Sequence, residues 1–180
     1  FDKKISWGDA AKVWVVSYIG NFVGCLILSL IFVWAGASGT ADYFAGFIGN
    51  KLAIPAGQMF FRAVLCNFFV CLGVLCGIKL KSETAKFLMI VMCIAGFVVS
   101  GFEHCVANMY YIPAGIFASI NADYVAKAKE LYGITGSQIA SLNWGNFFLV
   151  NLLPVTIGNI IGGGFIIGGL FFYLHGKNCK

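Results

Sequence analysis

Four long stretches of apolar residues dominate the sequence, and short polar segments separate them. The first, Val13 to Trp34, contains no charged residue, and as a helix it would extend roughly 33 Å, enough to cross a bilayer. The others are Met59 to Ile78, Phe87 to Phe117 and Phe147 to Leu174. We therefore predict an all-α integral membrane protein, a single domain over residues 1–180 whose crossings lie at about 13–34, 59–78, 87–117 and 147–174.

The third stretch predicts an interruption. It has 31 residues, too many for one straight crossing, and Glu103 and His104 lie near its middle. Ionisable side chains at that depth are costly unless they face protein or water, and irregular backbone is tolerated there only where it is buried or lines a cavity. Gly101 permits a break. We predict two half-helices that meet within residues 100–108, with the amino-terminal end of the second directed at the site.

The composition supports a membrane protein and excludes several other classes. Sixty per cent of the residues are hydrophobic and 11% are charged, against about 25% charged in a typical soluble domain. The net charge of +5 does not indicate nucleic-acid binding, because the lysines lie at the edges of the apolar stretches and form no basic stripe. We expect membrane lipid, and no nucleic acid, as a partner.

Lysine-rich and lysine-poor segments alternate between the predicted crossings. The rich segments are the amino terminus, the segment 79–86 and the carboxyl terminus; the poor ones are 37–58, with Lys51, and 118–146, where two acidic residues offset two lysines. By the positive-inside rule, both ends and the segment 79–86 face the cytoplasm. The lysines that carry this argument are Lys3, Lys4, Lys12, Lys79, Lys81, Lys86, Lys177 and Lys180.

Small residues and cysteines indicate packing rather than chemistry. Gly20 and Gly24, Gly158 and Gly162, and Gly164 and Gly168 are small-xxx-small pairs, which predict close helix packing. Six of the seven cysteines lie inside apolar stretches, so we interpret them as small buried hydrophobes without disulfides. We expect no metal and no cofactor.

Several motifs resemble those of one known family. They are Ser100 to Met109, Ile112 to Ile116, Phe61 to Asn67, Leu153 to Gly163 and Ile5 to Trp14. Together they cover nearly the whole chain and resemble the formate/nitrite transporter family. Within that family, the cysteine-rich composition is similar to the hydrosulfide-channel branch.

The resemblance implies a pentamer of aquaporin-like subunits, each with its own pore for small monovalent anions such as formate, nitrite or hydrosulfide. It implies a bacterial inner-membrane protein and no enzymatic activity. A family subunit has six helices in two inverted repeats, with a broken helix at the pore. This sequence corresponds to the last four, so we expect the first two in the remainder of a cleaved protein or in a separate chain.

The resemblance also assigns roles to single residues. His104 matches the central pore histidine, and Phe97 and Val70 match apolar residues that line the narrow part of the pore. Lys51 matches a lysine that attracts anions, supported by the carboxylate of Glu103. A buried carboxylate without such a cation would take up a proton.

Three asparagines complete the predicted site. Asn67, Asn108 and Asn159 match residues that hold the broken helix or contact the pore histidine. A structural role for His104, as a core histidine, and for Phe97, as ordinary apolar filling, stays an alternative.

Other functions fit the residues less well. A haem bound by two histidines needs both within the membrane, and the second histidine, His175, lies at the chain end. An aquaporin for neutral solutes would carry Asn-Pro-Ala, but Ile54 and Ile112 precede Pro-Ala here. Proton-coupled transport of the same anions stays open beside a channel, and so does the choice of anion.

Overall fold

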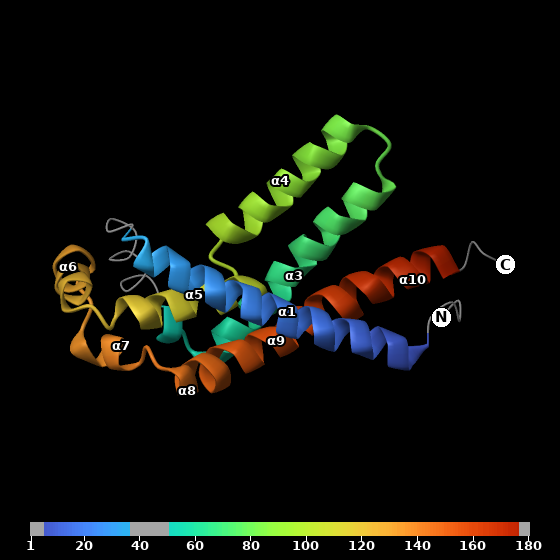
Figure 1. Ribbon diagram of the computed structural model, residues 1–180. Helices are drawn as coiled ribbons and strands as arrows, with labels where there is room; N and C mark the ends of the chain where they lie inside the picture. Colours follow the sequence, from blue (N-terminus) through green and yellow to red (C-terminus); the bar gives the residue numbers. More distant parts are fainter. Residues whose placement is uncertain (1–5, 37–50, 177–180) are drawn as a thin grey trace. The chain divides into compact units, whose positions relative to one another are not determined.

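The computed structural model describes residues 6–36 and 51–176, and every regular element in these ranges is a helix. Some lysines behind the predicted orientation, Lys3, Lys4, Lys177 and Lys180, lie outside the described residues. The helices, shown in Figure 1, are α1 (Trp7–Trp34), α3 (Ala56–Lys79), α4 (Glu83–Val99), α5 (Cys105–Ala118), α6 (Ala122–Tyr132), α7 (Gly136–Ala140), α8 (Trp144–Asn146), the π-helix η1 (Phe147–Leu152), α9 (Leu153–Ile160), the π-helix η2 (Ile161–Ile167) and α10 (Gly168–Gly176).

Three helical stretches in the described ranges are long and apolar enough to cross a bilayer. They are Trp7–Trp34 with 28 residues, Ala56–Lys79 with 24, and Trp144–Leu174 with 31, the last running through α8, η1, α9, η2 and into α10. The third predicted stretch is divided instead: α4 ends at Val99 and α5 begins at Cys105. The prediction of two half-helices that meet within residues 100–108 is confirmed.

Local residue choice explains where α1, α4 and α6 begin and end. The hydroxyl of Ser6 accepts a hydrogen bond from the backbone N–H of Asp9, and Ser82 and Asn121 cap α4 and α6 in the same way. Gly133 ends α6 at a φ of 63°, a backbone conformation that costs a residue with a side chain about 1–2 kcal/mol.

The chain divides into two compact units, residues 1–53 with 106–147 and residues 54–105 with 148–180. In the first unit, α1 packs against α5. The ring of Phe32 meets Tyr110 at 6.1 Å between centroids, and the thiol of Cys25 lies 3.7 Å from the carbonyl oxygen of Val106. A buried cluster of Val33, Ala118, Ala128 and Ile134 joins α6 to this pair.

In the second unit, α3 lies between two partners. It forms an antiparallel hairpin with α4 through the short connection 80–82 (Figure 1), and it also packs against α9 and η2. Gly158 and Gly162 face α3 so closely that a Cβ on Gly158 would lie 2.7 Å from the Cβ of Ala63, and one on Gly162 would overlap the carbonyl of Val64. The predicted close packing is thus confirmed at this pair.

The other two glycine pairs do not behave in this way. A Cβ on Gly20, Gly24 or Gly164 would meet nothing within 4 Å in the structure, and one on Gly168 would make only an ordinary contact at 3.5 Å. The prediction of close packing at these two pairs finds no support among residues 6–36 and 51–176.

Candidate functional site

The interruption between α4 and α5 is a short, tightly bonded stretch of backbone. Gly101 has a φ of 66°, which turns the chain out of α4. The next N–H, from Phe102, bonds to the carbonyl of Phe97 at 3.0 Å, and the N–H of Glu103 bonds to the carbonyl of Arg62 on α3 at 3.3 Å. The break is therefore docked onto α3 by main-chain groups that a continuous helix would use internally.

The side chain of Asn159, on α9, holds both sides of the break. Its amide nitrogen donates to the carbonyls of Ala63 at 2.8 Å and Glu103 at 2.9 Å, and its oxygen accepts from the N–H of Cys105 at 2.9 Å. Asn159 is 3% exposed, so these bonds are made away from solvent. An asparagine suits this position because one amide group supplies two donors and an acceptor.

Asn67 holds Asn159 in turn. Its amide nitrogen donates to the backbone carbonyl of Asn159 at 2.6 Å. The π-helix η2 begins two residues later, at Ile161, and π-helical segments recur at functional sites because they change the register of one helix face. The structure therefore connects α3, the last long helix and the break through two of the three predicted asparagines.

The third predicted asparagine, Asn108, and the predicted ion pair of Lys51 with Glu103 are divided between the two units. Asn108 is fully buried in α5, within the first unit. Glu103 is 1% exposed in the second unit and Lys51 is 9% exposed in the first. Their pairing stays a prediction, although charged groups so deeply buried need compensation.

The side chains of His104 and Phe97 stack at the break. Their ring centroids lie 5.8 Å apart with an angle of 23° between the planes, and His104 is half-buried. Phe102 contacts Phe69 of α3 with tilted rings, at 6.1 Å between centroids and 41° between planes. Val70 lies next to Phe69 and is also half-buried. The break thus carries two aromatic contacts beside the backbone bonds described above, and one of them is the stack of His104 on Phe97.

The sequence did not predict the groups on α3 that accept hydrogen bonds from Glu103 of the break and from Asn159. The carbonyls of Arg62 and Ala63 are backbone atoms, which no side-chain motif reveals. It also missed Asn151 of η1, which is fully buried with its amide nitrogen 3.5 Å from the sulfur of Met59. A single polar residue inside the apolar segment 147–153 was the signal for it.

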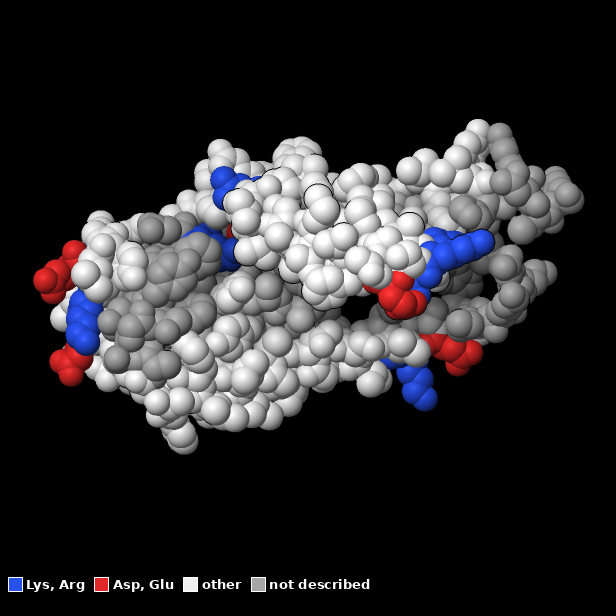
Figure 2. All heavy atoms as spheres, turned by 90° about the horizontal axis from the view of Figure 1, so that it is seen from above, with Lys and Arg blue, Asp and Glu red and all other residues white. Residues whose placement is uncertain are grey.

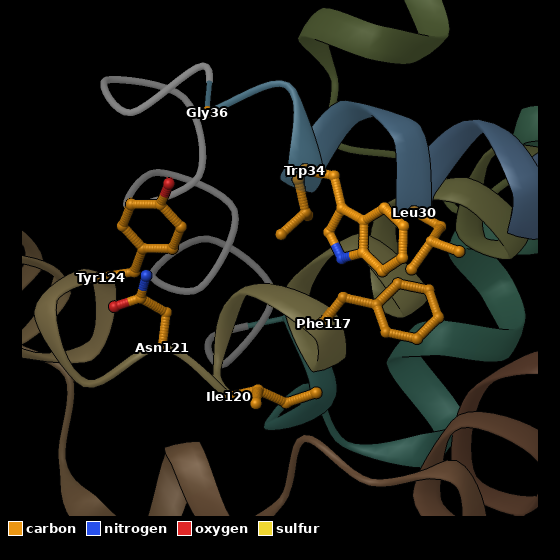
Figure 3. A pocket seen from close by; sticks show the side chains of 8 residues that line it. Leu30, Trp34, Gly36, Phe117, Ile120, Asn121 and Tyr124 are labelled. Carbon is orange, nitrogen blue, oxygen red and sulfur yellow. The ribbon is translucent and has the colours of Figure 1, made fainter.

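The first unit contains a hollow of about 670 Å³ away from these residues (Figure 3). Its wall is mostly apolar, and it lies between the carboxyl-terminal ends of α1 and α5 and the start of α6. It holds none of the predicted site residues. Its lining is Leu30, Val33, Trp34, Gly36, Phe117, Ile120, Asn121 and Tyr124.

Comparison with known proteins identifies the family to which this chain is similar. The family model described as formate/nitrite transporter matches residues 1–173. The formate channel FocA of Haemophilus influenzae is 36% identical over 177 residues, which cover 95% of this chain and 61% of that protein. The chain thus spans about three fifths of the length of the curated relatives it matches.

Solved structures are similar as well. A chain described as a pentameric formate channel with formate bound has a TM-score of 0.79 at 34% identity, and the match covers 96% of this chain and 69% of that one. An ion channel of the same family has a TM-score of 0.69 at 30% identity, covering 94% and 61%. These likenesses confirm the predicted fold class.

Proposed function

The chain belongs to the formate/nitrite transporter family, and from this we propose that it is part of a subunit of a pentameric membrane channel for small monovalent anions of weak acids. It is a multi-pass membrane protein. We assign transport rather than catalysis because the relatives are named as channels and transporters. Formate is the first candidate, since the matched curated relatives include formate channels; nitrite and hydrosulfide follow.

The observation that carries this proposal is the break itself. A buried asparagine and two α3 carbonyls hold an irregular stretch in the middle of an apolar helix pair, and that stretch presents His104 against Phe97. Irregular backbone at membrane depth is stable only where protein satisfies it or where it lines a cavity. We propose that this break holds the imidazole of His104 at the centre of the pore.

The proposed passage combines attraction with a narrow apolar section. Lys51, supported by Glu103, raises the local concentration of anions. An anion then loses water between Phe97 and Val70, which is costly without compensation. A charged His104 would pair with the anion there. Alternatively, a proton delivered through His104 would convert the anion for a moment into its neutral acid, which crosses an apolar section more easily. Asn67 and Asn159 keep the break in place, and Asn108 is proposed to support the same site from α5.

The second route makes proton-coupled transport the alternative function. The stacked position of His104 at the break supports proton-coupled transport as an alternative, because histidine is the side chain that exchanges a proton most readily near neutral pH. The two functions differ in whether a proton gradient alone can drive anion accumulation.

The proposal includes the setting of the protein. We place it in a bacterial inner membrane with both ends and the α3–α4 connection on the cytoplasmic side, as the lysine distribution indicates. The chain would contribute one channel domain to the subunit, since it spans about three fifths of the length of its curated relatives.

The test is anion flux in proteoliposomes made with the complete protein. Formate, nitrite and hydrosulfide are compared in turn across a range of external pH, with and without an imposed proton gradient. A channel gives flux down the anion gradient for at least one of the three. Accumulation against that gradient would favour the coupled transporter, and no flux of any of the three would contradict the proposal.

A further inference from the structure

The connection between α3 and α4 is a small basic cap on two apolar helices. Lys79 is the last residue of α3, and Lys81 lies in the connection. Lys86 and Glu83, on the first turns of α4, form an ion pair at 2.6 Å. Because Lys86 neutralises the one carboxylate of this segment, the lysines Lys79 and Lys81 leave the cap with two uncompensated positive charges.

Neither of these two lysines is neutralised from elsewhere in the described ranges. Lys81 is exposed, and no ion pair with an acidic residue of those ranges reaches it. The ammonium of Lys79 lies 5.2 Å from the ring centroid of Phe171 on α10, a cation–π contact that holds the charge without removing it. On the face shown in Figure 2, the charged side chains of the described residues occur in a few small groups.

Large apolar side chains lie directly beside the lysines. Ile78 precedes Lys79 and is 72% exposed, and Phe87 follows Lys86 and is 67% exposed. Ile78 is on α3, which is long enough to cross a bilayer, and Phe87 is on α4, which packs beside α3, so exposed apolar side chains here face acyl chains. The exposed apolar groups and the positive charges therefore meet at the level where a bilayer changes from acyl chains to headgroups.

We propose that this basic cap, Lys79 and Lys81 with the ring of Phe171, binds the headgroup of an anionic phospholipid, whose acyl chains lie against Ile78 and Phe87. In the orientation proposed above, the cap is on the cytoplasmic side, where anionic headgroups attract juxtamembrane lysines. The lipid phosphate supplies the negative charge that the chain itself does not provide there. The contact of Lys79 with Phe171 joins the cap to the last long helix, so the bound lipid bridges α3 and α10.

The test measures lipid binding and does not depend on transport. The complete protein, purified in detergent, is titrated with phosphatidylglycerol and separately with phosphatidylcholine, and bound lipids per subunit are counted by native mass spectrometry. We expect phosphatidylglycerol to bind more tightly to the parent protein. In the double variant K79Q/K81Q its affinity should fall about 25-fold, since one lysine near an anionic headgroup contributes about fivefold.

Two further variants separate this site from a general effect of charge. K127Q/K129Q removes the same number of charges from α6 and should leave phosphatidylglycerol binding unchanged. K79R/K81R keeps both charges and should retain binding, which also controls for folding. The proposal is overturned if K79Q/K81Q binds phosphatidylglycerol as the parent does, if K127Q/K129Q loses the same affinity, or if the parent binds both lipids equally.

Discussion

The amide nitrogen of Asn159 lies 2.9 Å from the backbone carbonyl of Glu103, and its oxygen lies 2.9 Å from the N–H of Cys105, on either side of His104. One side chain thus spans the residue proposed to work at the centre of the pore. The position of the imidazole depends on the last long helix as much as on the helices that the break interrupts.

Replacing Asn159 with alanine should release the break. The change removes the hydrogen bonds of Asn159 with the carbonyl of Glu103 and the N–H of Cys105, and removing one partner of a buried hydrogen bond costs about 1–3 kcal/mol. We expect a clear loss of thermal stability in detergent together with reduced flux. Asn21, exposed on α1, is the matched control, and Asn21→Ala should change stability by less than about 0.5 kcal/mol. Equal effects of the two changes would contradict the assigned role.

Gly162 should not tolerate a methyl group. A Cβ there would overlap the carbonyl of Val64, and neither helix backbone can yield without separating α3 from η2. We expect Gly162→Ala to destabilise the protein by about 1–3 kcal/mol. Gly164 has open space around its Cβ position, so Gly164→Ala should be neutral or slightly stabilising, and thermal unfolding of both variants measures the contrast.

Glycine should be required at position 101 because of the positive φ of its backbone, and not because a side chain there would clash with a neighbour. Its φ is 66°, while a Cβ would meet nothing within 4 Å. Gly101→Ala should therefore cost about 1–2 kcal/mol. Gly101→Asn should cost less, because asparagine adopts this conformation more easily. If alanine and asparagine are equally harmful, steric contact and not backbone strain limits this position.

His104 should control how flux depends on pH. Histidine in water has a pKa near 6.5, and both proposed routes use its protonation, so flux should change within about two pH units of that value. His104→Phe and His104→Asn should alter the profile, measured in proteoliposomes with protein shown to keep its oligomeric state. An unchanged profile in both variants would leave His104 a structural residue.

Lys51 and Glu103 should be coupled in anion entry. Both are buried, and a carboxylate without a nearby cation would repel anions. We expect Lys51→Ala to reduce flux about tenfold or more. In a double-mutant cycle with Glu103→Gln, the combined loss should be smaller than the sum of the single losses. Flux of Lys51→Ala equal to that of the parent protein would refute the pairing.

Much of the architecture can be predicted from the order of the residues. The apolar stretches indicate helices that cross a membrane, because a helix satisfies its backbone N–H and C=O groups within one segment where no water can bond to them. The excess length around Glu103 and His104, with Gly101 beside them, predicts the break, since length, charge and glycine are all local properties. The motifs that include His104 and Asn159 indicate the family in the same way.

The contacts that hold the break could be identified only in the folded structure. The acceptors of the N–H of Glu103 and of the amide of Asn159 are main-chain carbonyls of Arg62 and Ala63, and backbone atoms are alike at every position of a sequence. Of three glycine pairs with one spacing, only Gly158 and Gly162 approach another helix, because the direction in which a helix face points depends on the packing of the whole unit.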